Sequence, residues 1–239
     1  MKNYYLLLDT ETTQDQLVAD FGAVIVDKKG KIYSQCAVMV DGIFTDIEQH
    51  PLFFTSDNSP LWGKASLDRR YKTCQAMVNS GARMIASVSA INRWLDKALA
   101  TYNPMLTAYN LPFDLDKCRN TGIDLTGFAP RSFCLWAAAY TLFAHTKEYR
   151  SMALALHAFN APTSHGNMTF KTNAETMARF TSNNPALEDE PHTALEDVLF
   201  YELPILQAIL KKKPARWLLE GPKPYNWRDC QVRDFFSPK

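Results

Sequence analysis

The chain has 239 residues, of which 46% are hydrophobic and 21% are charged. This length is sufficient for one domain with a sizeable core. The formal net charge of +1 provides no global field that would attract a polyanion, so any nucleic-acid binding must depend on a local patch or on metal ions. The five cysteines form no CxxC pair, and no apolar run approaches the roughly 20 residues that span a bilayer. We therefore expect reduced thiols in a cytoplasmic protein without membrane contact.

Three strands are predicted near the N-terminus. A continuous apolar run at residues 4–9 is typical of a strand that is covered on both faces, which predicts a central position in the sheet. A second apolar run covers residues 23–26. Residues 27–30 form a turn into residues 32–40, which are rich in β-formers. The second and third strands are therefore predicted to form a hairpin.

The middle of the chain alternates between helical and extended patterns. Residues 41–75 contain two prolines and little periodicity, and we expect a loop with short helical turns. The last long helix should be kinked by Pro204. The other expected elements are a strand at residues 105–109 and helices at residues 84–99, 112–120, 131–146, 151–159 and 193–210. This order predicts an α/β protein with a mixed sheet.

The composition changes after Lys213, where prolines, tryptophans and scattered basic residues follow. Residues 1–213 are therefore predicted to form the main domain and residues 214–239 a C-terminal tail. The stretch Gln231–Phe236 ends in two aromatic residues and is similar to peptides that dock into bacterial sliding clamps. The alternative is that its phenylalanines pack on the chain's own domain.

Two acidic residues follow the first strand directly. Side chains alternate along a strand, so Asp9 and Glu11 share one face. Two ionised carboxylates at this spacing repel each other, and a divalent cation removes that repulsion. Oxygen ligands favour Mg²⁺ or Mn²⁺. The pair is not specific by itself, because a solvated strand end gives the same pattern and Asp46 and Glu48 repeat the spacing in a predicted loop.

A second element follows the strand expected at residues 105–109. If that strand neighbours the first one, Asp114 would lie near Asp9. Asn110 precedes Asp114 by four positions in the sequence. The alternative interpretation is a helix start, in which Asn110 caps the helix and Asp114 interacts with the helix dipole.

A third element opens the last long helix. His192 stands at the entry of this helix, and Asp197 follows five positions later. The ring of His192 could turn towards Asp197 across the first turn. Glu196 should point about 100° away and be exposed or charge-paired. A helix-capping histidine with a solvated aspartate is the alternative.

In this order and separation, the three elements resemble the DEDDh 3′→5′ exonucleases, the family of the proofreading epsilon subunit of DNA polymerase III and of ribonuclease T. The resemblance covers residues 4–211. The family often has Gly where Gln14 stands and Ala where Val198 stands. The matching motifs are Asp9-Thr10-Glu11-Thr12-Thr13, Asn110-Leu111-Pro112-Phe113-Asp114 and His192-Thr193-Ala194-Leu195-Glu196-Asp197.

The resemblance implies a ribonuclease H-like fold, with a central mixed five-stranded sheet flanked by helices. It also implies hydrolysis from the 3′ end of a nucleic acid by two metal ions. His192 would be the general base that takes a proton from the attacking water. The residues implied to hold two Mg²⁺ or Mn²⁺ ions are Asp9, Glu11, Asp114 and Asp197.

The resemblance also suggests how the 3′ end is held. We expect Thr12, Thr13, Asn110 and Phe113 to bind substrate, with packing in the core as the alternative for Phe113. Single-stranded DNA is the favoured substrate, and RNA or short oligonucleotides are the alternatives.

A protein of another class is also consistent with the fold. A non-catalytic adaptor could bind nucleic acid or a sliding clamp, but such a protein should have lost ligands, and all five catalytic positions are filled. Aromatic and basic residues in the irregular region could contact nucleic acid or simply form a surface loop. These residues are Trp62, Lys64, Arg69 and Arg70.

Overall fold

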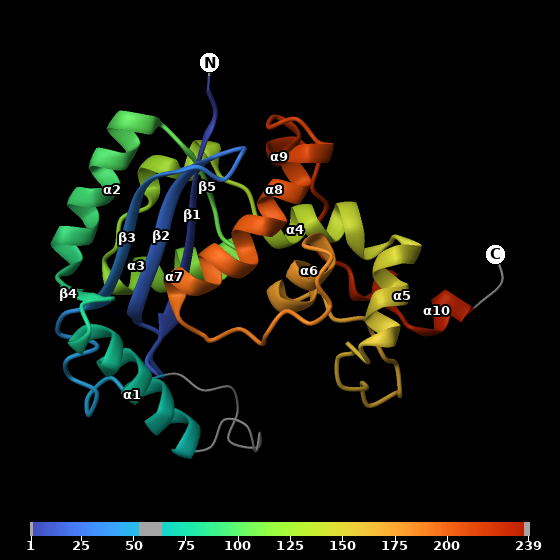
Figure 1. Ribbon diagram of the computed structural model, residues 1–239, viewed down its shortest axis with the longest axis horizontal. Coiled ribbons are helices and arrows are strands. Elements are labelled where there is room, and N and C mark those ends of the chain that lie inside the picture. The colour runs from blue at the N-terminus through green and yellow to red at the C-terminus, as the bar shows by residue number, and fades with distance from the viewer. Residues whose placement is uncertain (1, 53–63, 237–239) are drawn as a thin grey trace.

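The computed structural model describes residues 2–52 and 64–236, and its centre is a mixed sheet of five strands (Figure 1). The strand order is β4-β3-β2-β1-β5. The first three strands are antiparallel, whereas β4 is parallel to β3 and β5 is parallel to β1. The strands are β1 (Tyr4–Thr12), β2 (Val18–Asp27), β3 (Ile32–Val40), β4 (Met84–Ala86) and β5 (Met105–Thr107). The predicted α/β class with a mixed five-stranded sheet flanked by helices is confirmed.

The first three strands and their hairpin were predicted correctly. β2 and β3 pair in antiparallel register from Asp20 opposite Met39 to Val26 opposite Ile32. β1 is internal, since it pairs with β2 on one side and with β5 on the other. The middle strand of the sheet is β2, because β4 extends the β3 edge.

Helices cover both faces of the sheet, which explains the continuous apolar run of β1. Tyr5 and Leu7 belong to the core on one face, and Leu6 and Leu8 to the core on the other. The first core includes residues of α4 (Leu135–Ala139), α6 (Ala174–Thr181), α7 (Ala194–Asp197) and α8 (Leu203–Lys212), and the second includes residues of α2 (Val88–Tyr102) and α3 (Leu111–Thr121). In Figure 1, α7 and α8 cross in front of the strands and α2 lies along the opposite layer. By alternation, the residues that follow Leu7 at odd positions point towards the α7 layer.

The helices are mostly short. Two π-helical segments interrupt them, one after α4 at Tyr140–Ala144 and one between α7 and α8 at Val198–Glu202. The helices are α1 (Lys64–Asn79), α2 (Val88–Tyr102), α3 (Leu111–Thr121), α4 (Leu135–Ala139), α5 (Lys147–Ala155), α6 (Ala174–Thr181), α7 (Ala194–Asp197), α8 (Leu203–Lys212), α9 (Trp217–Glu220) and α10 (Arg233–Phe236).

Two predictions for the middle of the chain were wrong. Residues 64–79 form α1 rather than a loop, because Tyr71, Cys74 and Val78 pack as one helical stripe against Met39 and Phe44. The helix predicted from residue 84 begins only at the start of α2, where the Ser87 side chain accepts the first capping hydrogen bond. The residues before it form β4, which pairs with the end of β3. Both differences arise from tertiary contacts that local periodicity does not report.

The C-terminal segment packs on the rest of the chain. The N–H of Phe170 donates to the carbonyl of Cys230 at 2.9 Å, and the N–H of Val232 donates to that of Met168 at 2.9 Å. Phe235 packs against Phe170. Gln231, the first residue of the clamp-like stretch, is only 5% exposed. The structure therefore does not present this glutamine to a partner.

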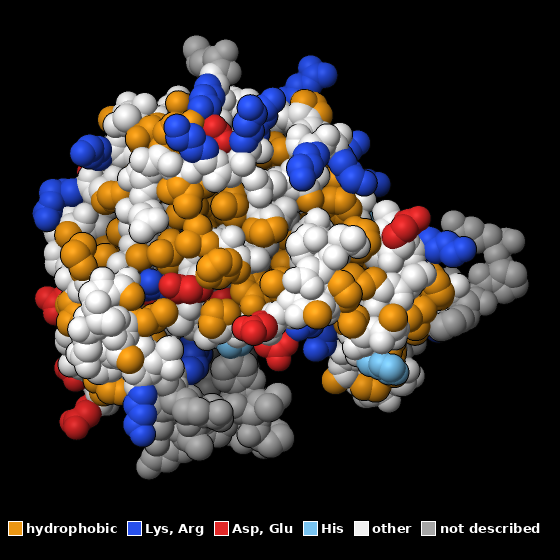
Figure 2. All heavy atoms as spheres, in the orientation of Figure 1, with side chains coloured by type: hydrophobic (Ala, Val, Ile, Leu, Met, Phe, Trp, Pro, Cys, Tyr) orange, Lys and Arg blue, Asp and Glu red, His pale blue; other side chains and the backbone are white. Residues whose placement is uncertain are grey.

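Charges are distributed unevenly over the surface. Lysines and arginines gather at the upper edge of the face in Figure 2, whereas acidic side chains and a histidine lie near its lower centre. The upper group surrounds a hollow beside the β2–β3 turn and includes Lys2, Lys28, Lys29, Lys31 and Lys213. Within the described residues, no helix is long and apolar enough to cross a bilayer.

Gly22 lies where α7 meets the sheet. It pairs with Asp9 on β1, and a Cβ added to it would lie 2.3 Å from the backbone nitrogen of Leu195 and 2.4 Å from the carbonyl carbon of Ala194. Backbone atoms cannot move aside as a flexible side chain can. The absence of a side chain at Gly22 therefore sets how closely α7 approaches β2, the strand beside β1.

We expect Gly22→Ala to lower the free energy of unfolding by about 3 kcal/mol, the upper end of typical overpacking effects. Urea unfolding followed by circular dichroism measures this loss. Gly81→Ala is the matched control. Its added Cβ meets nothing within 4 Å, so the only cost of this substitution is the backbone strain of an alanine at a φ of 78°. That strain costs about 1–2 kcal/mol. Equal losses in the two variants would contradict a close approach at Gly22.

Candidate active site

One cavity of about 480 Å³ gathers acidic side chains from separate segments of the chain. Two of them lie on β1, one on α3, one on α7 and the others in the segments that flank α7. His192 lies in the same wall. All five residues predicted to be catalytic therefore line a single cavity. The acidic residues are Asp9, Glu11, Asp114, Glu190, Asp197 and Glu202.

Buried polar contacts hold α7 against the sheet. Oδ2 of Asp20 accepts a hydrogen bond from the N–H of Ala194 at 3.0 Å. Nε of Arg83 lies 3.3 Å from Oδ1 of Asp20, and the same guanidinium pairs with Glu196. Glu196 is thus charge-paired, as expected. Because the first turn of α7 is fixed in this way, Asp197 faces the cavity.

Asp114 lies in the first turn of α3 and is 2% exposed. Oγ1 of Thr10 donates a hydrogen bond to its Oδ1 at 2.9 Å. Burial raises the pKa of Asp114 to about 7, although the hydrogen bond from Thr10 acts in the opposite direction. Asn110 lines the cavity and makes no side-chain capping hydrogen bond. Phe113 is 40% exposed in the cavity wall, so the interpretation of Phe113 as a core residue is wrong.

His192 lies at the cavity mouth beside two acidic residues. Its Nδ1 is 3.9 Å from Oε1 of Glu11. Glu11, His192 and Asp197 can each place one ligand atom within 4.8 Å of the others. Burial and the nearby guanidinium of Arg70 lower the pKa of His192, so its ring is neutral near pH 7. Its φ of 56° is uncommon for a residue other than glycine, and such backbone strain is concentrated at functional sites.

The carboxylates of the cavity hold protons more tightly than free acids do. Burial raises the pKa of Asp197 to about 9, and repulsion from Glu11 adds to this effect. Burial also raises the pKa of Glu190 to about 7. For Asp9, burial and repulsion from Asp114 act in the same direction. The fully ionised cluster is therefore unfavourable unless protons or cations neutralise it.

The donor atoms of the cavity fit divalent cations. Oδ1 of Asp197 and Oε2 of Glu202 are buried and have no hydrogen-bond partner among the described residues. Unpartnered buried oxygens are costly, and a bound cation would satisfy them. The set consists of carboxylate oxygens and one imidazole, which suits Mg²⁺ or Mn²⁺.

Glu202 is a cavity residue that the sequence analysis missed. It is 2% exposed, and its Oε1 accepts a hydrogen bond from the N–H of Tyr109 at 3.0 Å. In a regular α-helix, a residue five positions after Asp197 would point about 140° away from it. The π-helical segment Val198–Glu202 widens the turn and returns Glu202 to the cavity side. Pro204, two positions later, was the sequence signal for this irregularity.

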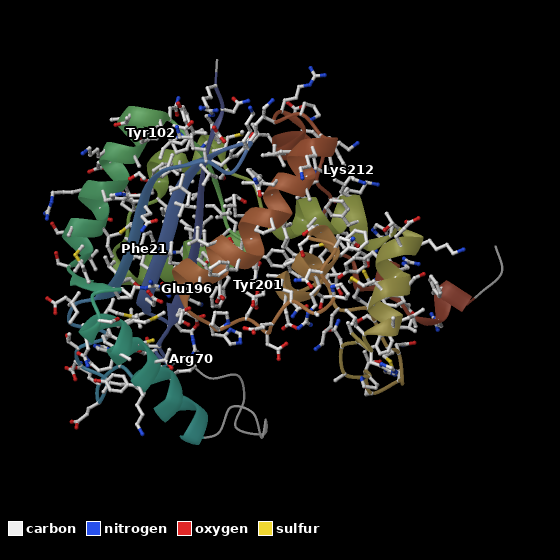
Figure 3. The ribbon with its side chains drawn as sticks, viewed as in Figure 1. Phe21, Arg70, Tyr102, Glu196, Tyr201 and Lys212 are labelled. Atoms are coloured by element: carbon white, nitrogen blue, oxygen red, sulfur yellow. The ribbon has the colours of Figure 1, made fainter. Side chains whose placement is uncertain are left out.

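Arg70 brings positive charge to the acidic cavity from α1. Its guanidinium forms an ion pair with Glu11, and its Nη2 donates to the carbonyl of His192 at 3.3 Å. Figure 3 shows Arg70 and Glu196 towards the lower end of the sheet, where β1 ends. Arg70 was expected in a loop, so this contact depends on a helix that was not predicted.

The remaining expected residues lie elsewhere. Thr12 and Thr13 are buried, and neither lines the cavity. Thr13 Oγ1 instead bonds to the backbone of the turn at Leu17. Trp62 falls outside the described part of the chain, as do the side chains of Lys64 and Arg69.

No protein-family model matches the chain, and no curated protein matches it. Among solved structures, the chain is similar to Exonuclease I of E. coli in complex with a dA16 oligonucleotide, with a TM-score of 0.49 and 13% identity. A complex of Exonuclease I with a dT13 oligonucleotide gives a TM-score of 0.48 and 16% identity. The matches cover 91% and 92% of this chain but only 42% and 43% of those chains, so the chain spans less than half of their length.

We expect the stability of the protein in EDTA to fall as pH rises from about 4 to about 9. The unfolded acids titrate near pH 4, whereas Asp114 and Glu190 titrate at about 7 and Asp197 at about 9 in the folded state. In this window the folded state binds more protons, so the free energy of unfolding decreases with pH. Thermal unfolding at several pH values measures the slope, and Mg²⁺ should reduce it.

Asp197→Asn tests the origin of this slope. At pH 8 the folded protein holds Asp197 largely protonated, because its pKa is about 9. The neutral amide removes the cost of protonating this buried acid, so it should raise Tm in EDTA by about 2–4 °C for each kcal/mol of that cost, and it should weaken the stabilisation by Mg²⁺. Glu48→Gln is the control, because Glu48 is exposed and does not line the cavity. A Tm in EDTA that does not depend on pH would contradict the electrostatic account.

Proposed function

We propose that this protein is a divalent-cation-dependent exonuclease that hydrolyses phosphodiester bonds from the 3′ end of single-stranded DNA, with RNA as the second substrate. One observation supports this proposal more strongly than any other observation does. Carboxylates from β1, α3 and α7 and a neutral imidazole line the same cavity. This combination suits metal-assisted hydrolysis of a phosphodiester.

The carboxylates would hold the cations. The residues assigned to two Mg²⁺ or Mn²⁺ ions are Asp9, Glu11, Asp114 and Asp197, whose four negative charges match two divalent cations. When bound, such ions stabilise negative charge on the attacking and leaving oxygens of an in-line displacement. The raised pKa of Asp9 and Asp197 indicates that the folded site needs this compensation.

His192 is the proposed general base. Its lowered pKa keeps the ring neutral near pH 7, so a ring nitrogen can accept the proton of the attacking water. The side chain is 39% exposed, and water can therefore reach it. The Glu11 carboxylate, 3.9 Å from Nδ1, would favour the imidazolium once it forms.

The 3′ end would be held beside these groups. Asn110 and Phe113 lie in the cavity wall, and the exposed Phe113 ring can stack on the terminal base. By the family resemblance, the backbone at Thr12 and the Glu11 carboxylate would hold the 3′-hydroxyl. A grip on a free end would make the enzyme an exonuclease.

We expect Asp9→Asn to abolish nucleotide release from a 3′-labelled single-stranded DNA in Mg²⁺, because a cation ligand is lost while the fold stays intact. His192→Ala should lower the rate by about 10²–10⁴-fold through loss of general-base catalysis. Gel analysis of the labelled products measures both rates, and circular dichroism checks the fold.

Asp46→Asn is the matched control. It changes an exposed aspartate that begins a second Asp-x-Glu pattern, and it should keep the full rate. EDTA should stop hydrolysis by the unsubstituted protein. Full activity of Asp9→Asn would refute the assignment. Binding of DNA without hydrolysis in either Mg²⁺ or Mn²⁺ would instead indicate a non-catalytic adaptor.

A further inference from the structure

The cavity has a second part that the proposed chemistry does not use. In addition to the acids, its wall contains aromatic rings and amide side chains, and no lysine or arginine is among the described residues that line it. This part of the wall is therefore neutral and partly aromatic. Its residues are Tyr109, Trp136, Asn160, Thr172, Asn173 and Tyr225.

Trp136 and Tyr225 form a fixed aromatic pair. Their rings stack with centroids 4.8 Å apart and an interplanar angle of 29°. Nε1 of Trp136 donates a hydrogen bond to Oγ1 of Thr172 at 3.0 Å, which holds the indole in place. Both rings are half-buried, so each keeps some surface open to the cavity.

Tyr225 comes from the C-terminal segment, which is tied down on both sides of it. The N–H of Lys223 donates to Oγ1 of Thr141 at 2.8 Å. The hydroxyl of Tyr140 donates to the carbonyl of Asn226 at 3.2 Å. These contacts hold Tyr225 in the wall of the cavity without any bound partner.

The chemistry of this wall selects one kind of group. A phosphate is unsuitable, because the wall offers no cationic side chain among the described lining residues and lies beside several carboxylates. A nucleobase is flat and uncharged, and it has polar edges that amides can pair with. A volume of about 480 Å³ suits a ligand of nucleotide size rather than the end of a duplex.

We propose that Trp136 and Tyr225 form a stacking subsite for an unpaired base next to the 3′ end of a nucleic-acid strand. This inference rests on the proposed function, which places the terminal phosphodiester at the carboxylates. A base that is still paired in a duplex cannot stack on these rings. The C-terminal segment, through Tyr225, thus contributes to the selection of single-stranded ends.

Binding without hydrolysis tests the subsite. The Asp9→Asn protein is titrated in Mg²⁺ with a 5′-fluorescein-labelled oligothymidylate, and fluorescence anisotropy gives Kd. Adding Tyr225→Ala should raise Kd about tenfold, as is typical when a base–aromatic stack is lost. Tyr225→Phe keeps the ring and should bind normally. Trp227→Ala is the control, since Trp227 is in the same segment, is 39% exposed and does not line the cavity.

An oligothymidylate that lacks its two bases nearest the 3′ end gives a second test. It should bind the Asp9→Asn protein about tenfold more weakly than the intact strand, and Tyr225→Ala should then have no further effect. The comparison of the two strands on the Asp9→Asn protein does not require the Tyr225→Ala protein to fold normally. Equal Kd values for intact and base-free strands would overturn the subsite even if hydrolysis is observed. If the unsubstituted protein neither hydrolyses nor binds the intact strand, the proposed function is overturned as well.

Discussion

The constraint on which the site depends is the burial of several carboxylates in one cavity, where burial and mutual repulsion both oppose their ionisation. Asp9, Asp114 and Asp197 come from different elements, and burial raises the pKa of each. Such a cluster persists only where a rigid frame holds it, because free side chains would separate. Here a strand covered on both faces, and a helix seated on Gly22, provide the frame. The proposed chemistry follows from the need of this cluster for positive charge.

Much of this frame could be predicted from local sequence. The continuous apolar run before Asp9 indicated a doubly covered strand, and strand alternation placed Asp9 and Glu11 on one face. The spacing of His192 and Asp197 at a helix start likewise uses short-range geometry. These inferences depend on neighbouring residues only, and the structure agrees with the strands. The convergence on one cavity was expected instead from the order of the three motifs and their resemblance to a known family, and the structure brings those residues together.

Other parts of the site depend on contacts between distant segments and could not be predicted. Arg70 reaches Glu11 only because α1 packs on the end of β3, through a stripe too short to give a clear period. Glu202 reaches the cavity through a π-helical turn, whereas regular helical geometry would point it away. Tyr225 reaches it because the side chains of Tyr140 and Thr141 form hydrogen bonds to the backbone of the C-terminal segment on both sides of it.

The ion pair between Arg70 and Glu11 has a thermodynamic consequence for loading of the site. In the absence of metal, the guanidinium serves as an internal counter-ion for the carboxylate. A cation that binds Glu11 must share the carboxylate with the guanidinium of Arg70 or displace that guanidinium. The free energy lost from the ion pair therefore weakens binding of the cation. Under the proposed function, a strand that enters the cavity would offer its phosphate as a new partner for the guanidinium. Metal and strand should therefore load cooperatively, and by reciprocity each raises the affinity for the other.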